Sequence, residues 1–344
     1  MKILVKLVSL FLSVVMTLTA PLGWIVGSRT ARIAHAKEDC RVSFAVLSDI
    51  HLRGSFKPIF QGMLELGLRD MEKAKDKLNA VAFVGDITDH GYIDQWDVFA
   101  DAVSRYDIAD ETMVVVGNHD TWGPNREAFD DPVDGVKATF IRYNKTVSGR
   151  EVTEMYYSDV INGVYFIALG SEADNTWAYL SDTQLEWFAR EMEKAAETGL
   201  PIFVLMHQPI NQTHGLPYIW NLRDGDPLDK GGIGDQSARV EAILKQYDNV
   251  FYISGHIHGG FKNAGSRIGA AYASVEYMKN NNGNPITLIN LPSYLYFDLK
   301  RGGHIANGCG WVIEVYDGEV LVRARNFAVG TWLTQYDQTV ELVG

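Results

Sequence analysis

The chain has 344 residues, of which 31 are lysine or arginine and 43 are aspartate or glutamate, and its formal net charge is −12 at pH 7. This acidic balance argues against general binding of nucleic-acid backbones, which depends on clustered basic residues. The length suffices for one large α/β domain, and two cysteines are too few for a disulfide scaffold.

The first 36 residues differ from the rest of the chain. Two lysines precede an apolar run over 7–26, and Ala34-His35-Ala36 fits a small-x-small cleavage site. This arrangement is typical of a secretory signal peptide and predicts cleavage after Ala36, with a secreted or cell-surface product and no integral membrane domain. The alternative is an uncleaved membrane anchor, because the run approaches the roughly 20 residues that span a bilayer.

Six short apolar runs follow, each bounded by turn residues, and we expect them to be strands that are covered on both faces. They are residues 42–48, 80–85, 112–117, 164–170, 201–207 and 249–255. Helical spacing of apolar residues lies between several of the runs, most clearly after Ser181. Alternating strands and helices predict an α/β architecture.

The last third of the chain is rich in strand-forming residues. Trp311 to Phe327 is predicted to be a hairpin with its turn at Asp317-Gly318, extending a sheet of the same domain. No segment has the Ser-, Pro- and Gly-rich composition of a linker, so we expect a single domain over 37–344. Cys40 and Cys309 either pair with each other or remain free thiols.

Two connections are long, over 121–158 and 208–236. Such connections in a compact domain are usually functional or disordered, and we expect function because each begins directly after a candidate ligand. Their aromatic and basic side chains are candidates for substrate contacts, although the rings are equally suited to holding the loops in place. The candidates are Trp122, Arg126, Tyr218 and Trp220.

Acids, amides and histidines collect where the apolar runs end. Five of the runs are followed by such side chains, and five of the nine histidines lie there. The carboxyl ends of strands form the edge at which active sites lie in open α/β sheets. One acid after a strand is usually a turn or cap residue, so the whole set carries the prediction. The set is Asp49, His51, Asp86, Asp89, Asn118, His119, Asp120, His207, His256 and His258.

In chain order the pattern reads Asp49-x-His51, Gly85-Asp86, Gly117-Asn118-His119-Asp120, an isolated His207 and Gly255-His256-x-His258. It resembles the signature of the calcineurin-like metallophosphoesterases over about 42–260, while the β-rich tail over 261–344 carries no matching motif. The resemblance implies a two-sheet β-sandwich flanked by helices, with the tail adding strands.

The resemblance also implies two metal ions. Asp49, His51 and His258 would hold the first ion and Asn118, His207 and His256 the second, with Asp86 bridging them. Carboxylate, amide and imidazole ligands suit Fe, Mn or Zn. The family pattern further implies that His119 serves the leaving group and that Asp89 orients it. Alternatively, Asp89 is only a turn residue. Asp120 either orients His119 in its place or caps a helix.

The resulting prediction is a secreted dinuclear phosphoesterase in which a metal-bridging hydroxide attacks phosphorus in line with the leaving group. His90 stands where related protein phosphatases have an arginine, and Asp89 stands where purple acid phosphatases have a metal-ligand tyrosine. The segment Met206 to Pro209 is similar to the HHPP element of related diesterases. These features favour phosphodiesters, with a small-molecule or lipid-derived phosphate ester as substrate. The alternatives are a phosphomonoesterase that scavenges phosphate and a non-catalytic metal-binding module.

Overall fold

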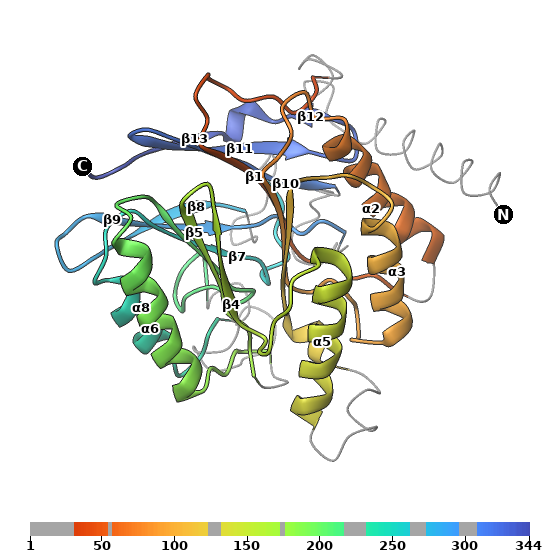
Figure 1. Cartoon of the computed structure of the whole chain (residues 1–344), viewed down its shortest axis with the longest axis horizontal. Coiled ribbons are helices and arrows are strands. Elements are labelled where there is room, and N and C mark those ends of the chain that lie inside the picture. Colours follow the sequence, from red (N-terminus) through yellow and green to blue (C-terminus); the bar gives the residue numbers. More distant parts are fainter. Residues whose placement is uncertain are drawn as a thin grey trace.

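Two mixed β-sheets lie face to face with helices on both outer sides in the computed structural model (Figure 1). The structure describes residues 31–53, 57–122, 132–172, 176–216, 232–261, 273–295 and 308–344. The predicted fold class, a two-sheet sandwich flanked by helices, is confirmed.

The first sheet joins the two ends of the chain. Its parallel centre is β1 (Val42–Leu47), β2 (Ala80–Val84) and β3 (Glu111–Val115). The antiparallel additions are β10 (Cys309–Tyr316), β11 (Glu319–Asn326), β12 (Thr331–Trp332) and β13 (Gln338–Glu341). The strand order is β12-β11-β10-β1-β2-β3, with β13 also on β11. The predicted C-terminal hairpin is therefore confirmed as β10 and β11, and it extends this sheet beside β1.

The second sheet has the order β4-β5-β6-β7-β9-β8. Its parallel centre is β5 (Val164–Ala168), β6 (Ile202–Leu205), β7 (Val250–Ser254) and β9 (Pro285–Asn290). Antiparallel strands close both edges, namely β4 (Tyr157–Ile161) and β8 (Val275–Lys279). All six apolar runs of the sequence are thus strands, three in each sheet.

The core lies between the sheets and under the helices. Phe44 of β1 meets Phe166 of β5 and Phe203 of β6 edge to face, with ring centroids 4.9 Å apart in both pairs. The first sheet is covered by α2 (Lys57–Glu72), α3 (Ile93–Val103) and α5 (Pro132–Ser148), and the second by α6 (Asp182–Ala196) and α8 (Ser237–Leu244) (Figure 1). Two short elements are α4 (Asn118–Thr121) and the 3-10 helix η3 (Thr334–Tyr336). Burial on both faces explains why the central strands read as continuous apolar runs.

The connection over 121–158 differs from the long loop expected from the sequence, because α5 occupies much of it. Tyr143 of α5 is buried, stacks on Trp96 with ring centroids 5.4 Å apart, and donates its hydroxyl to Asp97 at 2.6 Å. This part of the connection therefore packs against the fold. The candidate substrate contacts Arg126, Tyr218 and Trp220 lie outside the described residues.

The N-terminal segment, residues 31–36, packs onto the domain. Ile33 is only 1% exposed within the core, and its carbonyl accepts a hydrogen bond of 2.7 Å from the Lys75 amide. The Ala36 amide donates to Glu314 at 2.8 Å. Cleavage after Ala36 stays a prediction, but the folded domain includes residues ahead of the expected boundary at 37.

Cys40 and Cys309 are both free thiols. They flank opposite ends of the β1–β10 pair, whose register joins Val42 to Val315 and Val46 to Trp311. At about 3.3 Å per strand residue they lie roughly 13 Å or more apart, beyond the reach of a disulfide.

Among the described residues, no helix has the length and apolarity needed to cross a membrane.

Candidate metal centre

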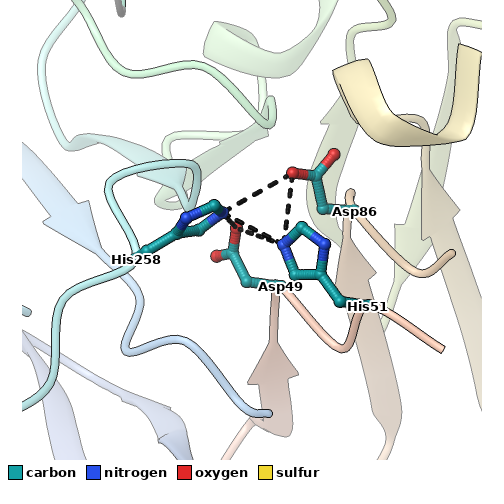
Figure 2. A group of neighbouring side chains, drawn as sticks. All are labelled: Asp49, His51, Asp86 and His258. Atoms are coloured by element: carbon teal, nitrogen blue, oxygen red, sulfur yellow. Dashed lines mark hydrogen bonds and ion pairs between the residues drawn. The ribbon is translucent and has the colours of Figure 1, made fainter. Parts of the chain in front are cut away.

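Loops that leave the carboxyl ends of strands in both sheets converge on one buried cluster. Asp49 and His51 follow β1, Asp86 follows β2, and His258 follows β7 (Figure 2). Because the sheets face each other, the ends of β1 and β7 meet although about 200 residues separate them. Figure 2 shows the four side chains pointing toward one common point.

The first group of candidate ligands is Asp49, His51, Asp86 and His258, whose ligand atoms lie within 4.8 Å of one another. His258 Nε2 lies 3.2 Å from Asp49 Oδ1 and 3.0 Å from His51 Nε2. His51 Nε2 is 3.6 Å from Asp86 Oδ2. Two imidazole nitrogens and two carboxylates that face one point form a donor set suited to a transition-metal ion.

The second group is Asp86, His207 and His256. His207 Nε2 lies 3.1 Å from Asp86 Oδ2 and 3.3 Å from His256 Nδ1. Asp86 Oδ2 thus faces both groups, which is the position predicted for the bridging ligand. Asn118, at the start of α4, is 2% exposed and belongs to the predicted ligand set.

The backbone at these ligands is held in an uncommon conformation. Among the described residues other than glycine, ten have positive φ angles between 47° and 73°, and five of these ten are candidate ligands: Asp49, His51, Asp86, His256 and His258. Such conformations cost on the order of 1–3 kcal/mol each and persist where the surroundings enforce them, most often at functional sites.

Two motif glycines allow the ligand loops to approach closely. A Cβ at Gly117 would lie 2.3 Å from Asp86 Oδ1, and one at Gly255 would lie 1.9 Å from Ser48 Oγ and 2.7 Å from Asp49 Oδ2. These distances are too short for any side chain. The glycines before Asn118 and His256 are therefore required for the loops to meet.

The donor atoms fit bound metal ions. His207 Nδ1 lies 2.9 Å from the Val84 carbonyl, which accepts its proton and leaves Nε2 directed at Asp86. Asp86 Oδ1 accepts the His119 amide at 2.8 Å, whereas Asp86 Oδ2 and Asn118 Oδ1 are buried without a hydrogen bond to any described residue. Buried acceptors of this kind are costly unless a cation satisfies them.

Protons balance the charges of this cluster in the metal-free chain. Burial alone would lower the pKa of His207, but the neighbouring charge of Asp86 raises it to about 9. Burial alone would raise the pKa of Asp86, but the charges of His207 and His119 hold it well below its usual value. Burial lowers the pKa of His51 to about 4. Metal binding must therefore displace the proton on His207.

His119 stands beside the cluster with one ring nitrogen fixed. Its Nδ1 lies 2.8 Å from the main-chain carbonyl of Asp89, which accepts the proton, so Nε2 is the atom available for proton transfer. The half-buried Trp122 packs against this ring, with centroids 4.0 Å apart. A direct substrate contact for Trp122 stays a prediction.

The carboxylate of Asp89 lies in one group with His51 and His119, and its nearest contacts are to other side chains than His119. Its oxygens lie 3.3 Å from His51 Nδ1, 3.1 Å from Arg53 Nε and 3.0 Å from His90 Nδ1. A carboxylate oxygen of Asp89 also lies within 4.8 Å of a ring nitrogen of His119, but the hydrogen bond to that ring comes from the main-chain carbonyl of Asp89 at 2.8 Å. An orienting role of the carboxylate for His119 stays a prediction, and the sequence pattern gives no signal that distinguishes the two kinds of oxygen in Asp89.

Asp120 ties two ligand loops together. Its carboxylate accepts hydrogen bonds from the amides of Ile87, Thr88 and Gly117 at 3.3, 2.8 and 2.9 Å, and from the Thr88 hydroxyl at 2.7 Å. With these four bonds it caps the start of α4 and joins it to the loop after β2. The helix-cap alternative for this residue therefore describes its contacts better than an orienting role for His119.

Comparison with known proteins agrees with this geometry. A family model described as calcineurin-like phosphoesterase matches residues 42–260, the stretch that carries the motifs. Among curated proteins, no sequence matches the chain significantly.

Solved structures share the fold. A dimetal phosphatase from Danio rerio matches with a TM-score of 0.53 and 12% identity, over 89% of this chain and 100% of the other. A purple acid phosphatase from yellow lupin (Lupinus luteus) matches with a TM-score of 0.54 and 12% identity, over 87% of this chain and 53% of the other. This chain therefore spans about half of the lupin enzyme.

Proposed function

We propose that this chain, which belongs to the calcineurin-like phosphoesterase family, is a dinuclear metal-dependent phosphodiesterase. The observation that carries the proposal is the shared position of Asp86, whose Oδ2 faces both groups of candidate ligands. A bridging carboxylate holds two ions roughly 3.5–4 Å apart, near enough to act on one phosphoryl group. Fe, Mn and Zn all suit the donor set.

When bound, the ions would polarise the phosphoryl group and lower the pKa of a water molecule so that it attacks phosphorus at neutral pH. The protein's own residues supply the rest. The loops hold the candidate ligands, two of them carboxylates, in a buried cluster, and His119 Nε2 is placed to give a proton to the alkoxide as the phosphorus–oxygen bond breaks. The Asp89 carbonyl keeps the other proton of His119 on Nδ1.

Diesters are favoured because His90, rather than an arginine, follows Asp89. Its Nδ1 is directed at the Asp89 carboxylate, so it adds little charge to a substrate phosphate. A phosphomonoesterase is the second candidate. The observation in its favour is Arg53, which lies at the edge of the centre with its side chain 39% exposed and would suit the dianionic phosphate of a monoester.

The test is hydrolysis of bis-p-nitrophenyl phosphate against p-nitrophenyl phosphate by chain 31–344, first stripped of metal and then reloaded with Mn, Zn or Fe. Diester turnover that returns with metal is the expected result. A preference for the monoester would select the second candidate. Stoichiometric metal binding without turnover of these or of natural phosphate esters would support the non-catalytic module instead.

An extracytoplasmic location is part of the proposal and rests on the sequence of residues 1–36. Fractionation of cells that express the full chain tests it, with N-terminal sequencing of the product. Export is the expected result, and recovery of the intact chain in the cytoplasm would contradict it.

A further inference from the structure

Asp89 lies against two histidines of the candidate centre, His51 through its carboxylate and His119 through its main-chain carbonyl. The chain that follows β1 runs beside the chain that follows β2, where the His51 amide donates to the Asp86 carbonyl at 2.9 Å and the Asp89 amide to the Leu52 carbonyl at 3.1 Å. This register places the side chain of Asp89 against His51 and Arg53.

Basic side chains lie on two sides of the Asp89 carboxylate, at ion-pair distances. One oxygen lies 3.3 Å from His51 Nδ1, and the other lies 3.1 Å from Arg53 Nε and 3.0 Å from His90 Nδ1. The side chain is 9% exposed, so water does little to stabilise its charge. Arg53 and His90 therefore compensate the carboxylate on its outer side, while His51 contacts it on the inner side.

His51 presents its other nitrogen to the ligand cluster. Nε2 lies 3.0 Å from His258 Nε2 and 3.6 Å from Asp86 Oδ2, on the side of the ring away from Asp89. A histidine ligand whose second nitrogen donates to a carboxylate is fixed in tautomer and orientation and becomes a stronger donor. His207 is arranged similarly, with the Val84 carbonyl in the place of the carboxylate.

We propose that Asp89 is a positioning residue for the first metal site, where its carboxylate fixes His51, and that its main-chain carbonyl independently fixes His119. The two roles belong to different atoms of one residue. Substitution of the side chain removes the first role and leaves the second in place, since every amino acid has the carbonyl. The proposal extends the dinuclear function and rests on it for the metal but not for turnover.

The experiment is calorimetric titration of metal-free chain 31–344 with Mn or Zn, for the parent, Asp89→Ala and Asp89→Asn. We expect one of the two metal affinities to fall about 10–100-fold in Asp89→Ala. Asp89→Asn retains an acceptor oxygen without the charge, so it should fall between Asp89→Ala and the parent. It also serves as the second variant if Asp89→Ala does not fold.

The matched control is Asp70→Asn. Asp70 lies near the end of α2, accepts two bonds from Arg325 at 2.6 and 2.7 Å, and belongs to none of the groups of candidate ligands. Its substitution removes a similarly paired carboxylate without touching the centre. It should lower stability and leave both metal affinities unchanged.

The pH profile of turnover is a second measurement, and it distinguishes the role of the Asp89 carboxylate from that of its main-chain carbonyl. With metal at saturation, the Asp89 variants should keep the pH profile of the parent, because the carbonyl contact to His119 persists. Unchanged metal affinity with a lost or displaced limb of the pH profile would overturn the proposal and return the carboxylate to His119. The calorimetric result needs no turnover, so failure of the phosphodiesterase proposal is distinguishable from failure of this one.

Discussion

Charged groups are buried in two regions of this molecule, and they are satisfied in different ways. Around the N-terminal segment, Arg325 contacts Asp70 through two bonds and the Ala31 carbonyl at 3.0 Å, while Glu314 accepts from Arg323 and the Ala36 amide. In the candidate metal centre, Asp86 Oδ2 and Asn118 Oδ1 make no hydrogen bond to a described residue, although His207 Nε2 faces the first at 3.1 Å, and the backbone of five candidate ligands has positive φ angles.

The difference separates stability from function. Around the N-terminal segment the acceptors are paired and offer nothing for a cation to satisfy, and the group that remains there without a hydrogen bond among the described residues is a donor, Arg325 Nη1. Unsatisfied acceptors on strained loops lower stability, and they persist where a bound ion gives the compensating energy. We therefore expect substitutions in the metal centre to change activity strongly, and substitutions around the N-terminal segment to change stability alone.

The largest effect is expected for Asp86→Asn. The amide keeps an oxygen for the His119 amide but loses the charge that both groups of ligands share. Turnover of a diester should fall by about 10³-fold or more, since bound metals contribute several kcal/mol to the transition state. Steady-state kinetics at saturating metal measure it. Activity within tenfold of the parent would mean that Asp86 does not bridge.

His119→Gln should follow in size, with a loss of about 10²–10⁴-fold for an alkyl ester, because the alkoxide leaves without a proton. A p-nitrophenyl leaving group needs little protonation, so its hydrolysis should fall much less. The ratio of the two losses is the measurement. Equal losses for both esters would show that His119 does not act on the leaving group.

Deletion of residues 31–36 tests the other region. Removal of buried Ile33 costs about 1.5–3 kcal/mol, and loss of the hydrogen bonds to Glu314 and Arg325 adds to it. Urea unfolding of chains 31–344 and 37–344, both metal-free, should differ by about 3 kcal/mol, with equal turnover per folded molecule. Equal stabilities would show that this segment only rests on the surface.

The alkaline pH dependence should be the smallest effect. Because Asp86 raises the pKa of His207 to about 9, the folded chain binds a proton that the unfolded chain releases near pH 6.5. This stabilisation is fully present below pH 6.5 and is lost as pH rises toward 9. Metal-free protein should therefore lose on the order of 1–3 kcal/mol between pH 6.5 and 8.5.

The metal-loaded protein is the control for this pH dependence, since an ion takes the place of the proton on His207. Its free energy of unfolding should stay nearly constant over the same range. A metal-free chain that gains stability with pH would contradict the charge arrangement described for His207 and Asp86.

The sequence is sufficient for the six apolar strands, for the C-terminal hairpin and for a set of candidate ligands that the fold brings together. Continuous apolar runs identify strands that are buried on both faces, and the residues that follow them share an edge by topology. The hairpin of β10 and β11 followed from its turn residues. The sequence prediction lacks α5, because the length and aromatic content of its segment indicate a long functional loop.

Contacts that depend on register were beyond the sequence. The two roles of Asp89 arise from which oxygen faces which histidine, and spacing alone does not encode this. Arg53 joins the site only because the chain that follows β1 runs beside the chain that follows β2. Likewise, the composition of residues 31–36 suits a cleavage site, and only the fold reveals that Ile33 fills the core.

The central claim is that two ions share Asp86. Crystals of the metal-free chain soaked with Mn, and anomalous diffraction from them, test it most directly. We expect two anomalous peaks on either side of Asp86, one beside Asp49, His51 and His258 and the other beside Asn118, His207 and His256. A single peak at full metal occupancy, or two peaks with Asp86 bound to neither, would contradict the account.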